Sequence, residues 1–140
     1  MRSMYLPALA LILAISTVSD AQAQSNNAGL SARKIAIKNA TLQTLSQGEI
    51  IAMVGLALAA DIDCDGVELD QTYHDSLEAD FVKVVAHQRK ARRDRDGRRY
   101  FLAFQQKYGL VNQKDNRNLC AAFRKEITEG SFLGAVLKLN

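Results

Sequence analysis

Residues 55–99 decide the fold of this chain, and they read GLALAADIDCDGVELDQTYHDSLEADFVKVVAHQRKARRDRDGRR. The segment begins on an apolar run and turns through a cluster of acidic residues. Apolar side chains then recur three or four residues apart, a spacing that predicts one face of a long helix over residues 67–93. We expect residues 94–97 to interrupt the chain, and a further helix to follow over residues 98–108 and to end at Gly109.

The remaining segments also predict helices. Residues 32–46 have a roughly helical spacing of apolar side chains. Residues 49–60 are apolar on nearly every side but too short to cross a membrane, which predicts a helix buried at the centre of the domain. An apolar stripe over residues 119–127 is followed by a last short helix over residues 132–139, which Ser131 can cap. No segment alternates apolar and polar residues over the length of a strand, so the predicted architecture is all-α.

The N-terminus predicts export of a single domain. Arg2 precedes an apolar core at residues 6–15, and the polar residues that follow end in Ala-Gln-Ala, a pattern that signal peptidase accepts. The apolar core is too short to span a bilayer, which favours a cleaved signal peptide. The alternative is that the segment is not cleaved and anchors the protein in the membrane. We expect a cleaved signal peptide at residues 1–23, a flexible N-terminus at residues 24–31 and a single helical domain at residues 32–140. The expected location is the periplasm.

Composition narrows the class of protein further. The chain has 140 residues, of which 48% are hydrophobic, enough for one packed core. A formal net charge of +3 is mildly basic and does not suggest a nucleic-acid partner. Because exported proteins meet an oxidising compartment, we expect the only two cysteines, Cys64 and Cys120, to form one disulfide; two separate buried thiols are the alternative. The predicted fold is a compact all-α bundle of five or six helices pinned by that disulfide.

Residues 61–66, Asp-Ile-Asp-Cys-Asp-Gly, open like an EF-hand calcium loop. That loop needs a bidentate carboxylate at its last ligand position, which is Thr72 here. We therefore expect a structural turn whose acidic residues lie over the positive end of the next helix, with no metal and no cofactor. The alternative is a calcium-responsive module in which Ca²⁺ is held by Asp61, Asp63, Asp65 and Glu68.

Charge is divided along the same segment. Residues 61–80 contain eight acidic residues and no Lys or Arg, whereas residues 83–99 contain eight basic and two acidic residues. On one continuous helix, acidic residues towards the N-terminal end and basic residues towards the C-terminal end would interact favourably with the helix dipole, which gives the charges a structural role. The alternatives are head-to-tail self-association and a patch for an anionic partner such as lipid headgroups, a polyanionic glycan or an acidic protein surface. That patch would comprise Arg89, Lys90, Arg92, Arg93, Arg95, Arg98 and Arg99.

The residue types of catalytic sites are scarce in this chain. His74 and His87 are the only histidines, and their separation of 13 residues fits no common metal pair on one helix. A disulfide would leave neither cysteine as a thiolate nucleophile. We therefore expect no enzymatic activity.

A family resemblance rests on the order of features from residue 55 onward. An apolar helix reading LALAAD comes before the first cysteine, and a long helix and a basic segment precede an aromatic helix. The most specific pattern is LCAAFRKEI at residues 119–127, followed by GSFLG. In these features the chain resembles an uncharacterised family of small exported proteins of Gram-negative bacteria, a domain of unknown function, over residues 55–140. The resemblance implies the helical fold, export and the Cys64–Cys120 pairing, and it implies no activity.

The sequence therefore predicts an exported periplasmic protein with a non-enzymatic role in the cell envelope, either in binding or in structure. Its partner would be an envelope protein or an anionic envelope surface. Nucleic acid is not expected as a partner, and neither is an integral membrane segment after signal cleavage. Besides the calcium-responsive module, the alternative function is that of a small periplasmic chaperone or inhibitor.

Overall fold

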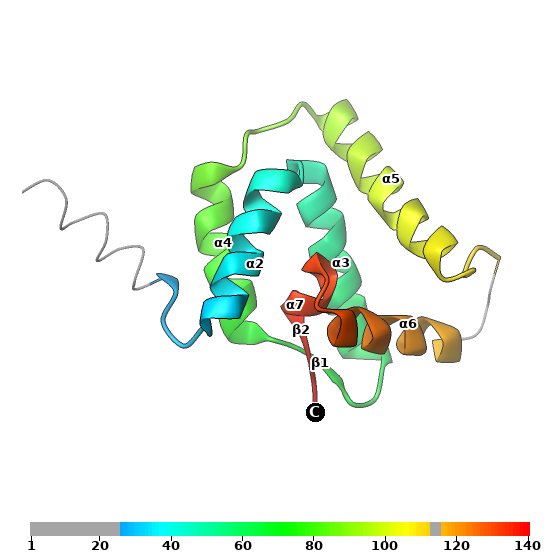
Figure 1. The fold of residues 1–140 in the computed structure, drawn as a ribbon. Coiled ribbons are helices and arrows are strands. Elements are labelled where there is room, and N and C mark those ends of the chain that lie inside the picture. Colours follow the sequence, from blue (N-terminus) through cyan, green and yellow to red (C-terminus); the bar gives the residue numbers. More distant parts are fainter. Residues whose placement is uncertain (1–25, 113–115) are drawn as a thin grey trace, which may run out of the picture.

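The computed structural model describes residues 26–112 and 116–140 (Figure 1). The expected signal peptide, residues 1–23, lies outside the described residues. In chain order the elements are α2 (Ala32–Thr44), α3 (Gln47–Asp63), β1 (Val67–Leu69), α4 (Gln71–Val84), α5 (Lys90–Lys107), α6 (Asn116–Glu129), α7 (Phe132–Val136) and β2 (Leu137–Leu139). These elements confirm the predicted all-α bundle. Within the described residues, every helix is too short or too polar to cross a membrane.

The core lies around the short helix α7, which α2, α3, α4 and α6 all contact (Figure 1). Residues 133–136 of α7 are buried. Ser131 begins the helix as expected, because its hydroxyl accepts a hydrogen bond from the Gly134 N–H at 2.9 Å. A Cβ on Gly134 would lie 2.0 Å from the Glu126 carbonyl oxygen of α6. The backbones of α6 and α7 are therefore in direct contact, and only glycine fits between them.

One disulfide joins the end of α3 to α6. Cys64 is the C-cap residue of α3, and it is bonded to Cys120 of α6, which lies 56 residues further along the chain. Both cysteines are buried. The predicted disulfide and the bundle that it pins are confirmed. In the chain-entropy view, closing a loop of this length stabilises a fold by about 4 kcal/mol.

The chain does not form the long helix expected over residues 67–93. It forms β1 and α4, leaves the helical path at a linker of residues 85–89, and begins α5 at Lys90. The break expected at residues 94–97 is also wrong, because α5 continues through it. Both differences arise where the N-terminus of α3 meets the linker and the first turns of α5.

Contacts with α3 hold the linker and position α5. The Gln88 N–H donates to the Gln47 side-chain oxygen at 2.7 Å, and the Gly48 N–H donates to the Gln88 side-chain oxygen at 3.0 Å. A Cβ on Gly48 would lie 2.1 Å from the Arg93 carbonyl oxygen, and one on Gly97 would lie 3.2 Å from the Gly48 oxygen. Gly97 therefore allows close helix packing and does not end a helix. These contacts join residues about forty positions apart, which local periodicity cannot report.

The last helix is shorter than the one expected over residues 132–139. α7 ends at Val136, and β2 then pairs with β1 as an antiparallel ladder in which Leu137 lies opposite Leu69. Each strand has three residues, too few for an alternating pattern to be recognised in the sequence. The pair holds the end of the chain against the connection between α3 and α4.

Candidate binding surfaces

An apolar groove separates α3 from α4, and we call it the α3–α4 groove. It has a volume of about 370 Å³, within the range of ligand pockets. Its walls are formed by Ile50, Ile51, Val54, Gly55 and Leu58 of α3 and by His74, Leu77, Glu78 and Phe81 of α4. Ile50 and Leu77 are almost completely buried, so they form its inner side. Space above Gly55 is open, because no atom lies within 4 Å of the position that a Cβ would take.

The groove exists because α3 is apolar on more sides than its neighbours cover. Met53 and Ala57 on its inner face are completely buried, whereas Ile51 is 48% and Leu58 43% exposed. Ile62 is 80% exposed and continues the same stripe, since the three exposed residues lie seven and four positions apart. The sequence predicts a helix buried at the centre of the domain. The structure buries one face of α3 and leaves this stripe in contact with solvent, so that prediction is wrong for the stripe.

His74 and Glu78 are the polar side chains of the groove, and they lie one helical turn apart on α4. His74 Nδ1 lies 3.4 Å from an Asp75 carboxylate oxygen, and the same oxygen accepts a hydrogen bond from the Gln71 amide at 2.6 Å. Among the described residues, His74, Asp75 and Glu78 form the one group of three whose ligand atoms lie within 4.8 Å of one another. These donor types could hold a divalent cation. The spacing of the two histidines does not reveal the group, because its other members are carboxylates.

The predicted basic patch lies at the start of α5 and immediately before it. Six of its seven residues are exposed, and Arg93 is partly buried against α3. Two of the exposed residues have local partners: Lys90 pairs with Asp94 at 2.8 Å, and Arg95 with Asp96 at 3.5 Å. The other four have no carboxylate oxygen of the described residues within 4.0 Å of their guanidinium groups: Arg89, Arg92, Arg98 and Arg99.

The helix dipole opposes this placement of charge. On the expected continuous helix the basic residues would lie near the C-terminal end, where cations are favoured. In the structure they lie in the N-terminal half of α5, and those up to Arg93 are at its positive end, within the first turn or just before it. Hydrogen bonding compensates in part. The Lys90 ammonium lowers the pKa of Asp94, and the Gln88 amide lowers the pKa of Asp96, so both carboxylates stay charged among the arginines. The dipole role expected for the charge order is therefore wrong for the basic residues at the start of α5, although Asp70 caps the positive end of α4 as that role requires.

The acidic turn at residues 61–66 uses part of its oxygens inside the fold. Asp61, in the last turn of α3, accepts a hydrogen bond from the Leu69 N–H at 2.9 Å. Glu68 accepts one from the Asn140 side chain at 2.6 Å, which ties β1 to the end of the chain. Two of the four residues that a calcium ion would need are thus already engaged in holding the connection between α3 and α4.

The other two residues of the calcium alternative have cationic neighbours. Asp63 and Asp65 line a hollow together with Arg117 and Arg124, and Arg124 donates to the Asp65 carbonyl oxygen at 2.6 Å. A cation in this hollow would be repelled by both guanidinium groups. Within the described residues, the acidic turn brings no three ligand atoms within 4.8 Å of one another. The geometry favours a structural turn over the calcium module. The expected place of its acidic residues over the positive end of the next helix is wrong, because β1 separates the turn from α4, whose N-terminus is capped by Asp70.

Sequence reasoning missed a buried charge where the N-terminal segment meets α2 and α4. The Lys38 side chain is 0% exposed, and its ammonium lies 2.6 Å from the Asp80 carboxylate and 2.8 Å from the Ser76 hydroxyl. It also donates to the Asn27 side-chain oxygen, while the Asn26 amide donates to Asp80 at 3.0 Å. A lysine on a partly apolar helix gives no sequence signal for such a site, because its partners come from other segments.

Comparison with known proteins identifies no relative. No protein-family model, no curated protein and no solved structure matches this chain. The resemblance to a family of small exported proteins therefore stays a prediction. Function has to be inferred from the α3–α4 groove and from the basic residues of α5.

Proposed function

We propose that this chain is an exported, non-enzymatic binding protein of the cell envelope, which takes up apolar side chains of an envelope protein in the α3–α4 groove. The groove is the observation that supports this most directly. It is lined almost entirely by aliphatic and aromatic side chains, and Ile51 and Leu58 on its α3 wall are nearly half exposed. Contiguous apolar surface that stays in contact with water is typical of an association site.

A periplasmic location is part of the proposal. It is supported by the signal-peptide pattern of residues 1–23 and by the disulfide, since disulfides persist in oxidising compartments. Fractionation of cells that produce the full chain tests the location. We expect the processed and oxidised protein in the periplasmic fraction, and a reduced protein that stays in the cytoplasm would contradict it.

The non-enzymatic role is supported by where the reactive side chains lie. Both cysteines are in the disulfide, so neither offers a thiolate. His87 lies on the linker near Gln47, at 3.5 Å from its amide, while His74 faces the groove on α4. The chemistry of the groove is thus mainly apolar contact. The basic residues of α5 supply a second surface, which suits an anionic partner.

Binding of the neutral dye Nile red tests the groove. We expect the oxidised protein to bind the dye, and Leu58→Asp to weaken that binding about tenfold, because a carboxylate on the groove wall would have to be desolvated. Val82→Asp is the matched control, since Val82 is 73% exposed on α4 and does not line the groove. Equal losses in the two variants, or no loss in Leu58→Asp, would contradict the proposed site.

A photoreactive side chain at Gly55 identifies the partner. Benzoylphenylalanine fits there because the space above Gly55 is open. We expect one envelope protein to be cross-linked from Gly55 in intact cells, no such adduct from Val82, and loss of the adduct when Leu58→Asp is added. A small periplasmic chaperone would use the same exposed stripe and would yield many adducts. An adduct that still forms in the Leu58→Asp variant would contradict the assignment of the α3–α4 groove as the binding site.

A further inference from the structure

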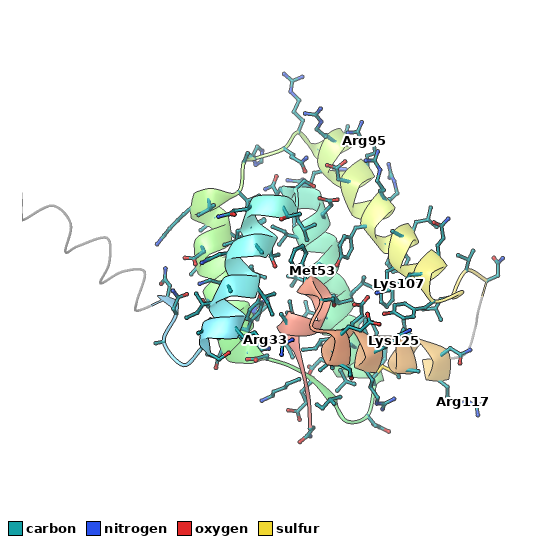
Figure 2. All side chains as sticks on the ribbon, in the orientation of Figure 1. Arg33, Met53, Arg95, Lys107, Arg117 and Lys125 are labelled. Carbon is teal, nitrogen blue, oxygen red and sulfur yellow. A yellow bond between two sulfur atoms is a disulfide. The ribbon has the colours of Figure 1, made fainter. Side chains whose placement is uncertain are left out.

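We propose that one side of α5 binds the anionic headgroup surface of a phospholipid membrane. This side, the α5 outer face, is the exposed half of the helix: it extends from Arg92 and Arg99 at one edge, through Arg95 and Leu102, to Arg98 and Phe101 at the other edge, and all six residues are exposed. The inference rests on the proposed envelope function and names the anionic partner of that function. α5 lies along the outer edge of the molecule, and Arg95 lies near its N-terminal end at the periphery (Figure 1, Figure 2).

Helix geometry separates the outer face from the side of α5 that packs on the protein. Residues three, four and seven positions apart share a side of a helix. Gly97 faces α3, and Phe104, which is buried, stacks on Phe123 of α6 with ring centroids 5.3 Å apart. These contacts fix the helix at both of its halves. The opposite side is therefore presented to solvent in one orientation, so that several arginines can meet one surface together.

The electrostatics of this face favour an anion. Arg92, Arg98 and Arg99 have no carboxylate oxygen of the described residues within 4.0 Å. After the Lys90 hydrogen bond, the charge of Arg98 also lowers the pKa of Asp94, so the charge of Arg98 is partly offset while Arg92 and Arg99 form no ion pair among the described residues. Arg92 lies in the first turn of α5, where the free N–H groups of the helix add positive potential, whereas Arg98 and Arg99 lie in the third turn. This placement of Arg92 costs helix stability, and the three arginines together attract negative charge outside the fold. A role in binding accounts for it, and a role in folding does not.

Exposed apolar side chains favour a membrane over the other anionic partners. Phe101 is 44% and Leu102 46% exposed, and they lie three and four positions after Arg98 on the same side of the helix. A polyanionic glycan offers charge but no apolar phase for these side chains. At a bilayer interface, arginines reach phosphate groups while neighbouring aromatic and aliphatic side chains enter the boundary of the acyl chains. The α5 outer face combines both requirements.

Sedimentation with sucrose-loaded vesicles tests the inference on the exported, disulfide-bonded protein. We expect it to bind vesicles that contain phosphatidylglycerol and not vesicles of pure phosphatidylcholine. Arg92→Gln together with Arg99→Gln should weaken binding about 25-fold, at about fivefold for each arginine, and high salt should have a similar effect. Phe101→Ser together with Leu102→Ser should weaken it about tenfold, because the apolar anchors are lost.

The matched control removes the same charge from other surfaces. Lys83→Gln together with Lys138→Gln changes α4 and β2 and should leave vesicle binding within about twofold. Equal losses in the control and in the arginine variant would overturn the inference, because net charge alone would then explain binding. Absence of binding to anionic vesicles would also overturn it. Unchanged vesicle binding after the Phe101 and Leu102 substitutions would also overturn the membrane inference, and it would indicate that the α5 outer face binds a polyanion.

The groove variant separates this inference from the proposed function. Leu58 lies on α3 and not on the α5 outer face, so Leu58→Asp should leave vesicle binding unchanged while it weakens Nile red binding. Loss of vesicle binding alone in the α5 variants, with dye binding intact, supports two separate surfaces. If the native protein binds the dye but no vesicles, only the membrane inference fails.

Discussion

Replacing Asp80 with asparagine should destabilise the fold more than replacing Lys38 with methionine, although the two residues form one ion pair. The reason is their unequal burial. The Lys38 side chain is 0% exposed, whereas that of Asp80 is 22% exposed. If the carboxylate is removed, the ammonium remains inside the protein with only the neutral oxygens of Ser76 and Asn27 as partners. If the lysine is removed, water and the Asn26 amide can still solvate Asp80.

The expected magnitudes follow from that difference. Leaving one charge of a buried pair without its partner costs about 3 to 5 kcal/mol, and we expect Asp80→Asn near the lower end because asparagine keeps one oxygen. Lys38→Met fills the same space with an unbranched side chain and leaves a carboxylate that water can reach, so about 1 to 2 kcal/mol is expected. The double variant contains no buried charge, so it should be more stable than Asp80→Asn alone.

Urea denaturation of the oxidised protein at neutral pH, followed by circular dichroism, measures all three free energies of unfolding. The decisive comparison is between Asp80→Asn and the double variant. A double variant that is less stable than Asp80→Asn would refute the reasoning, since it would mean that the buried ammonium carries no penalty. Lys38→Met costing as much as Asp80→Asn would refute it as well.

Further expectations concern helix packing, alkaline stability and the disulfide. Gly48→Ala should lower the free energy of unfolding by about 1 to 3 kcal/mol in urea denaturation, because its Cβ would meet the backbone of α5. Gly55→Ala in the same helix is the control and should stabilise the fold by up to about 1 kcal/mol, since the space there is open. Equal effects of the two substitutions would contradict the close packing of α3 and α5. Burial raises the pKa of Tyr73 to about 12 and those of Tyr100 and Tyr108 above the ordinary 10.0. Unfolded tyrosine ionises first, so stability should fall as the pH rises above about 10, and tyrosinate absorbance should appear together with loss of the helical signal. Absorbance that appears near pH 10 with the helices intact would contradict this. Reduction of the disulfide should remove about 4 kcal/mol of stability, as calorimetry with and without reductant would show. Calcium should leave the melting temperature unchanged, and a rise that an Asp63→Asn substitution abolishes would instead establish the calcium-responsive module.

The sequence by itself determined the features that depend on neighbouring residues. Ser131 caps α7, and Gly109 ends α5 with a φ of +63°, both as expected, because a helix end is decided within a few positions along the chain. The disulfide follows as directly, since Cys64 and Cys120 are the only cysteines and can pair in one way. Helical spacing likewise located α2 and most of α3 and α6, where the apolar face of each helix repeats regularly.

Only the tertiary structure decided where the long central segment breaks, which charge is buried and which apolar face stays open. The linker at residues 85–89 is held by Gln47 and Gly48, and Lys38 is neutralised by Asp80, so each outcome depends on a partner about forty residues away. The exposed stripe of α3 has the same origin. An apolar helix carries the same pattern whether or not a neighbour covers each face, and the number of helices available to cover it is a property of the packed bundle.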